Sequence, residues 1–146
     1  MIAQTQPDAQ LMGWNVRVGA TFPFRHSYPS ARTIAAYQLP ESLPEVLSTM
    51  TAGEDLEAQQ RLEKQLLVIR KQGHEISGSA IVPGITDVSC PILNYLGVAV
   101  AALTVPMVGP HTKGQKSGTI ITAATQTAAQ ISLAIGGTPE PASATA

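Results

Sequence analysis

Two strand-like runs joined by a short turn place the strongest constraint on what this chain can fold into. In the first run, Val88, Cys90 and Ile92 alternate with two polar residues and a proline. This period of two is typical of a strand with one buried face. Residues 94–97 begin with Asn and end with Gly, a turn signal that leads directly into the apolar run 98–105. The two runs predict an antiparallel hairpin, and we expect its second strand to be buried on both faces.

The clearest helix is predicted over residues 54–72. Acidic residues stand near its start and Arg70 and Lys71 near its end, an order that suits the helix dipole. Gly73 follows as a stop signal. Its apolar residues form one stripe on an otherwise hydrophilic surface, namely Leu56, Leu62, Leu66, Leu67 and Ile69. We therefore expect a surface helix that packs along one side.

Three further helices are predicted from the spacing of apolar residues and from residues that start or stop a helix. Residues 30–37 begin with Ser30 as the expected cap and end before Pro40. Residues 41–50 carry Pro44 in the first turn and an apolar stripe at helical spacing. The helix expected over residues 117–135 has five apolar residues on one face, namely Ile120, Ala124, Ala128, Ile131 and Ile135.

A first strand is expected over residues 11–18, where apolar residues alternate with polar or small ones. The order is then strand, helices, hairpin and closing helix, without a repeated strand-helix-strand crossover. This order favours an α+β fold, an antiparallel sheet flanked by helices, over a doubly wound parallel sheet. So few strands leave open sheet edges, which favour pairing with other strands. We therefore expect a truncated chain or tight oligomerisation.

Charge and composition exclude several classes of function. The formal net charge is −1 and aromatic residues make up 4% of the chain, so neither a basic patch nor a stacking platform for nucleic acid is expected. The single cysteine, Cys90, cannot form an internal disulfide, which suits a reducing cytoplasm. No secretory signal begins the sequence, and the apolar run 98–105 is too short to cross a bilayer. We expect a cytoplasmic protein without membrane contact, with a disordered lead-in (1–10), one domain (11–137) and a disordered tail (138–146).

Six short sequence motifs occur in the same order as in a known protein family. The first two are Val16-Arg17-Val18-Gly19 with Phe22-Pro23-Phe24 and His26, and then Ala31-Arg32 leading into Ile34-Ala35-Ala36-Tyr37. The others are Ile69-Arg70-Lys71-Gln72-Gly73-His74, Pro83-Gly84-Ile85, Cys90-Pro91-Ile92, and Gly97 with Ala101-Ala102-Leu103-Thr104-Val105. In order and spacing this series resembles the effector domain of IclR-type transcriptional regulators, over roughly residues 16–135.

The resemblance implies a GAF-like, profilin-like domain that binds a small metabolite, either an organic acid or an aromatic compound, as its effector partner. It also implies a homo-oligomer, dimer or tetramer, and DNA binding only through a helix-turn-helix segment that this sequence does not show. The ligand-binding residues implied by position are Phe22, Ser30, Ala31, Ser77, Asp87, Thr104 and Pro106. Arg25 is an insertion relative to the family pattern, and residues 28–31 replace its small, glycine-containing turn. The identity of the ligand therefore does not carry over.

Each of these residues also has a structural interpretation. Phe22 fits a core position, and Ser30 and Ser77 fit turn positions that bond their own backbone. Asp87 shares the strand register of Ser89, so its carboxylate points away from the main apolar face. It is either a solvated acid at a strand edge or part of the pocket, where it would disfavour an acidic ligand and prefer a donor-rich or cationic one.

No signal for catalysis, a cofactor or a metal stands out. Cys90 alternates with apolar residues and is expected to be a small core side chain. His26, His74 and His111 share no metal-ligand spacing, and His26 is expected to orient the loop beside the pocket. The prediction is a sensor domain. Its rivals are a small metabolite-converting enzyme that uses Asp87 or His26 as acid or base, and a purely structural assembly domain.

Overall fold

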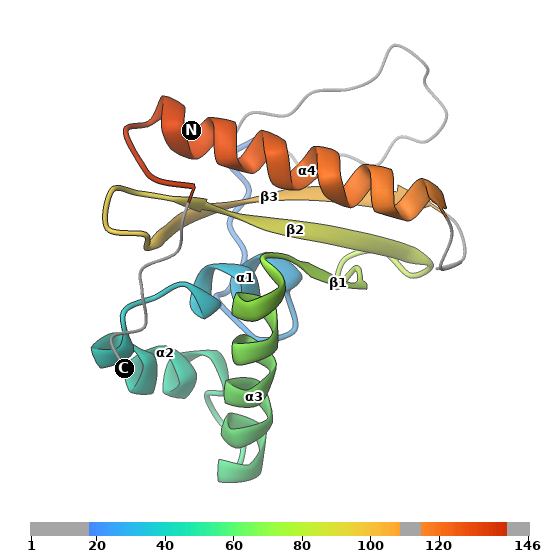
Figure 1. Ribbon diagram of the computed structural model, residues 1–146. Coiled ribbons are helices and arrows are strands. Elements are labelled where there is room, and N and C mark those ends of the chain that lie inside the picture. Colours follow the sequence, from blue (N-terminus) through green and yellow to red (C-terminus); the bar gives the residue numbers. More distant parts are fainter. Residues whose placement is uncertain (1–17, 109–114, 140–146) are drawn as a thin grey trace.

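The protein forms three layers around a small sheet, with α4 on one face and α1 on the other (Figure 1). The structure is a computed structural model and describes residues 18–108 and 115–139. Within these residues the sheet is antiparallel, in the order β1-β2-β3, and α2 and α3 lie beyond α1. The predicted α+β architecture, an antiparallel sheet flanked by helices, is confirmed. Of the strand predicted over residues 11–18, only Val18 is described, and it lies in a turn. The rest of that strand, the lead-in at 1–10, His111 and the part of the tail from residue 140 lie outside the described residues.

Helix α1 (Pro29–Ala36) begins one residue earlier than predicted. Tyr28 is the N-cap, with extended backbone angles and no side-chain cap, so the expectation that Ser30 caps the helix is wrong. The physical reason is Pro29, whose fixed φ suits the first helical position and whose ring pushes the preceding residue into the extended region.

The segment from Pro40 to Gln72 folds as predicted apart from its boundaries. The predicted helix 41–50 is a 3₁₀ turn, η1 (Pro40–Ser42), followed by α2 (Leu43–Met50). Helix α3 (Leu56–Gln72) begins after Asp55, whose carboxylate accepts a hydrogen bond from the Ala58 amide at 2.9 Å. It ends at Gly73, which has a φ of 82°, a left-handed conformation that glycine adopts without strain.

The predicted hairpin is present and longer than expected. Strands β2 (Ile85–Leu93) and β3 (Ala99–Val108) pair along their length, and β1 (Glu75–Gly78) pairs with the other edge of β2. The expectation that the second hairpin strand is buried on both faces is wrong, because most β3 residues are half-buried or exposed and Val100 is 54% exposed. The fully covered strand is β2, which lies between the other two.

Helix α4 (Gln115–Ala134) packs on β2 with a face slightly rotated from the predicted one. Ala124 and Ala128 are buried as expected, and Ile121 packs with them. Ile135 is 55% exposed, because the helix ends at Ala134 and the chain turns at the left-handed Gly136. Within the described residues, none of the helices combines the length and apolar character needed to cross a bilayer.

Candidate functional site

Strand β2 presents chemically opposite residues to its two helical neighbours. Val88, Cys90 and Ile92 lie in one apolar cluster with the small residues of α4. The intervening residues Asp87 and Ser89 point to the other face, because side chains alternate along a strand, and both are buried there. The prediction that the Asp87 carboxylate faces away from the main apolar side agrees with this register. We call the α1-facing surface around these residues the polar face.

Strand register assembles the polar face in two neighbouring rows. One row contains Ser77, Asp87 and Pro106, and the next contains Glu75, Ser89 and Thr104. Four of the seven residues implied by the family resemblance therefore lie together, namely Ser77, Asp87, Thr104 and Pro106. Pro106 is exposed and Thr104 half-buried, so the polar face can be reached from the β3 side.

The other three implied residues lie on or before α1. Ala31 belongs to the apolar cluster that includes Leu62 and Leu66 of α3, so it packs toward α3. Ser30 is half-buried at the start of α1. The Phe22 ring is 48% exposed, with its centroid 5.7 Å from that of Tyr28. No recorded contact joins these three described residues to the polar face.

Arg32 is the residue of the polar face that sequence reasoning missed. Its Nε donates to Glu75 Oε1 at 2.7 Å, and its Nη2 donates to Ser77 Oγ at 2.9 Å. Its Nη1 donates to the backbone oxygen of His26. The guanidinium thus fastens α1 to β1 and to the loop before α1. The available signal was an arginine on a helix, Pro29–Ala36, whose other residues are uncharged.

Glu75, which sequence reasoning also missed, is a buried carboxylate with hydrogen-bond partners at one oxygen and none at the other in the described part of the chain. Oε1 lies 2.5 Å from Arg32 Nη2 and accepts from Gln65 Nε2 at 3.4 Å. Oε2 has no hydrogen-bond partner in the described part of the chain. Burial raises the pKa of Glu75, and the bonds from Arg32 act in the opposite direction.

Asp87 differs from Glu75 because no cation in the described part of the chain forms an ion pair with it. It lies in the middle of the central strand, and its residue is 9% exposed. Burial raises its pKa, and a hydrogen bond with Ser79 opposes that effect. A carboxylate in this position retains capacity to accept hydrogen bonds.

Three buried or half-buried hydroxyl groups lie on or near the polar face, those of Ser89, Thr104 and Thr33. Ser89 Oγ and Thr104 Oγ1 lie 2.8 Å apart and bond each other across the strands. Thr33 is fully buried, and its Oγ1 has no partner among the described residues. Thr33 follows Arg32 on α1, the helix that covers this face of the sheet.

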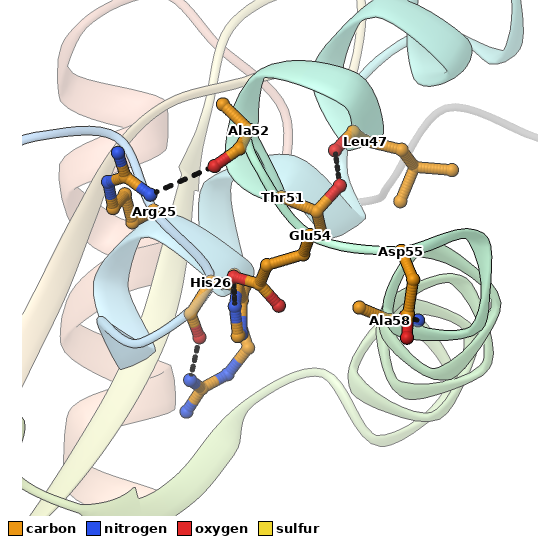
Figure 2. A network of polar contacts seen from close by, with 9 residues as sticks. Arg25, His26, Leu47, Thr51, Ala52, Glu54, Asp55 and Ala58 are labelled. Atoms are coloured by element: carbon orange, nitrogen blue, oxygen red, sulfur yellow. Dashed lines mark hydrogen bonds and ion pairs between the residues drawn. The ribbon is translucent and has the colours of Figure 1, made fainter.

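The loop before α1 is fastened to the turn between α2 and α3, as Figure 2 shows. His26 Nε2 lies 2.6 Å from Glu54 Oε1, and Arg25 donates to the Ala52 carbonyl at 3.4 Å. Thr51 Oγ1 donates to the Leu47 carbonyl at 2.8 Å and ends α2. The imidazole of His26 is therefore engaged in holding the loop, and its recorded side-chain partner is Glu54 rather than Asp87.

Two hollows in the described structure lie away from the polar face. One, of about 270 Å³, is bounded by the end of α3, the edge of β2 at Cys90–Leu93, and α4. The other, of about 200 Å³, lies between α1, α2 and α3. Neither is lined by any of the seven implied residues. A ligand on the polar face would therefore have to lie between α1 and the sheet or enter over β3.

Cys90 is a core side chain. It is fully buried, its Sγ lies 3.7 Å from Thr125 Oγ1, and burial raises its pKa, which keeps the thiol protonated and unreactive. Within residues 18–108 and 115–139, no group of three or more His, Cys, Asp or Glu side chains could hold a metal ion.

The comparisons with known proteins agree on one family. The model of the family described as "Bacterial transcriptional regulator IclR C-terminal" matches residues 1–133. No curated protein matches the sequence.

Several solved structures share the fold. A transcriptional regulator from Rhodococcus sp. RHA1 is 17% identical with a TM-score of 0.71, and the match covers 88% of this chain and 53% of that one. An IclR regulator from Silicibacter sp. TM1040 is 20% identical, with a TM-score of 0.66 and coverages of 82% and 48%.

An IclR homologue from Microbacterium hydrocarbonoxydans, solved with 4-hydroxybenzoate, is 21% identical, with a TM-score of 0.63 and coverages of 86% and 51%. The chain spans about half the length of these three regulators.

Proposed function

We propose, from the premise that this chain belongs to the family of IclR C-terminal domains of bacterial transcriptional regulators, that it senses a small metabolite. The metabolite, either an organic acid or an aromatic compound, binds at the polar face. The domain acts in the cytoplasm as part of a dimer or tetramer. DNA is contacted by a helix-turn-helix segment outside this domain, and the domain itself binds without converting its ligand.

The observation that carries this proposal is the polar face itself. A buried polar atom without a partner destabilises a folded protein by about 1–3 kcal/mol. Thr33 Oγ1 and Glu75 Oε2 are two such atoms in the described part of the chain. Thr33 lies on α1 beside Arg32, and Glu75 lies on β1, where Arg32 contacts it. A bound molecule that supplies their partners would remove that penalty, as expected of a binding site with a few convergent polar groups.

Sensing requires that the ligand bind two arrangements of the domain unequally. Helix α1 is the element whose position distinguishes such arrangements, because Arg32 joins it to Glu75, Ser77 and the preceding loop by polar contacts. A ligand inserted beside these contacts favours one position of α1. That preference is then passed to neighbouring subunits through the oligomer.

The proposal is tested by thermal unfolding and calorimetry with a panel of small organic acids and aromatic compounds. A ligand at a hundredfold excess over its Kd adds about 2.7 kcal/mol of stability, which raises Tm by several degrees in a chain of this size. Thr104→Val should abolish the shift, because it removes a hydroxyl from the polar face. Thr127→Val, the same change at an exposed position of α4, should retain it. A shift that survives Thr104→Val and Asp87→Leu would place binding elsewhere.

The enzyme alternative draws support from Asp87, because a buried carboxyl with a raised pKa is a common general acid or base. Incubating the protein with each compound that binds, followed by mass spectrometry, separates the two functions. A sensor returns the compound unchanged at unit stoichiometry, whereas an enzyme accumulates product in proportion to time.

A further inference from the structure

The polar face contains more negative than positive charge. Its contacts involve one guanidinium, that of Arg32, and two carboxylates, those of Glu75 and Asp87. All three nitrogens of the guanidinium already donate, to Glu75, to Ser77 and to the His26 carbonyl. Arg32 is therefore committed to holding α1 and has little capacity left to receive the carboxylate of a ligand.

Among the residues that the structure describes, no guanidinium or ammonium group pairs with Asp87 on the polar face. Asp87 is flanked by Ser77 and Pro106 in its own row and by Ser89 in the next. These neighbours are neutral, and the hydrogen bond from Ser79 serves only part of the acceptor capacity of the carboxylate. A second carboxylate brought next to Asp87 in this buried setting would be repelled, whereas a positive or N–H-bearing group would be attracted.

The unpartnered atoms have the same preference. Glu75 Oε2 can only accept hydrogen bonds when the carboxyl is ionised, and Thr33 Oγ1 can accept as well as donate. Glu75 is the diagonal neighbour of Asp87 on the same face, a separation of about 7–8 Å that one small molecule can bridge. The face thus offers several acceptors to its ligand and few donors.

Building on the proposed function, we propose that the metabolite sensed here carries a nitrogen-bearing donor group, an amine, amidine or amide, that is received by Asp87. Compounds that present a carboxylate to Asp87 are rejected. Of the two ligand classes considered above, organic acids and aromatic compounds, this favours an aromatic compound, or another compound, that has no acidic head group. The Microbacterium hydrocarbonoxydans homologue was solved with an acid, 4-hydroxybenzoate, so the inference separates this chain from that protein.

The test uses three compounds with one ring and different head groups, namely 4-hydroxybenzamidine, 4-hydroxybenzamide and 4-hydroxybenzoate. Each is titrated into the full 146-residue chain at neutral pH, with calorimetry and NMR shifts as readouts. We expect the amidine to bind most tightly, the amide next, and the acid at least about tenfold more weakly than the amidine. Equal or tighter binding of the acid overturns the inference, and so does an absence of amidine and amide binding at millimolar concentration.

Two variants locate the effect. Asp87→Asn should weaken the amidine about tenfold and strengthen the acid, because it removes the facing charge while keeping the shape. Glu57→Gln removes one negative charge from an exposed position on α3 and should leave the order of the three compounds unchanged. An Asp87→Asn variant that is folded by circular dichroism and keeps the wild-type preference would contradict the assignment to Asp87.

The wild-type protein supplies an independent check that needs no substitution. Amidine binding should strengthen as pH rises and the Asp87 carboxyl ionises, with Glu75 of β1 contributing in the same direction and Arg32 of α1 remaining charged. An amidine affinity that stays constant or decreases as pH rises through the ionisation of Asp87 contradicts the inference. If the acid binds and Thr104→Val abolishes that binding, the sensor proposal holds and only the proposed head group is wrong. If none of the three compounds binds, both proposals are contradicted.

Discussion

The two faces of the sheet bury different kinds of side chain, mainly apolar ones under α4 and polar ones under α1. Under α4, Val88 and Cys90 pack with Ala124 and Ala128 in a mainly apolar cluster, and Cys90 Sγ lies 3.7 Å from Thr125 Oγ1 of the helix. Under α1, the same strand buries Asp87 and Ser89, and the packing depends on hydrogen bonds and one ion pair. The α4 face is built to hold the fold together, since apolar burial needs no partner. Next to α1, Thr33 Oγ1 and Glu75 Oε2 are buried without a partner in the described residues, which lowers stability. We propose that a ligand supplies those partners.

The largest effect should come from breaking the ion pair of the polar face. Arg32→Met leaves Glu75 buried and uncompensated, which destabilises by about 3–5 kcal/mol. Adding Glu75→Leu should restore most of that loss, because the double variant has no buried charge left at this pair. Urea unfolding followed by circular dichroism measures both.

The matched control is the exposed pair of Arg61 and Glu57, which are 2.8 Å apart with side chains 63% and 74% exposed. Arg61→Met should change stability by less than about 1 kcal/mol. If Arg32→Met proves as mild as Arg61→Met, the ion pair does not organise the polar face.

A second prediction compares one position on each face. Val88→Ala should lower the free energy of unfolding by roughly 1.5–3 kcal/mol, because it removes fully buried apolar surface under α4. The double change Ser89→Ala and Thr104→Val removes both members of a buried hydroxyl pair and should be nearly neutral for stability. It should nevertheless eliminate ligand binding, measured by calorimetry. A double variant that unfolds as readily as Val88→Ala would show that the two faces do not differ in this way.

The smallest effect concerns pH. Because the pKa of Asp87 is raised in the folded protein, the native state holds that proton more tightly than the unfolded chain does. Stability is therefore greatest below the ordinary carboxyl range and declines as pH rises through the window up to the folded pKa. Asp87→Asn should flatten this decline in part, and Glu75, whose pKa is raised as well, accounts for the remainder.

Urea midpoints collected at several pH values measure the slope. Glu57→Gln, at an exposed site, should leave it as in the wild type. A slope that Asp87→Asn does not alter would mean that the carboxyl titrates equally in both states.

The sequence predicts the elements well wherever local chemistry decides them. Helix α3 follows from its amphipathic stripe and from Gly73, and the hairpin follows from the alternation around Cys90 and the turn after Leu93. Alternation predicted the side of β2 on which Asp87 lies, and the family resemblance alone pointed to Ser77, Thr104 and Pro106, which the strand register places on the same face.

Long-range packing decides what could not be predicted. The Ala and Val content of β3 gives no indication that β2 is the strand between two others, so burial was assigned to the wrong member of the hairpin. Arg32 and Glu75 lie 43 residues apart in the sequence, and their pairing follows only from where α1 crosses the sheet. Thr33 was missed for the same reason, since a threonine near the middle of a helix usually has a local hydrogen bond.

The bond from Arg32 to the His26 carbonyl gives the domain a mechanical linkage. His26 in turn holds Glu54, which directly precedes Asp55, the residue that caps α3. These contacts run in series from the guanidinium to the first turn of a 17-residue helix. If a ligand moves α1 as proposed above, they are the route by which α3 would respond.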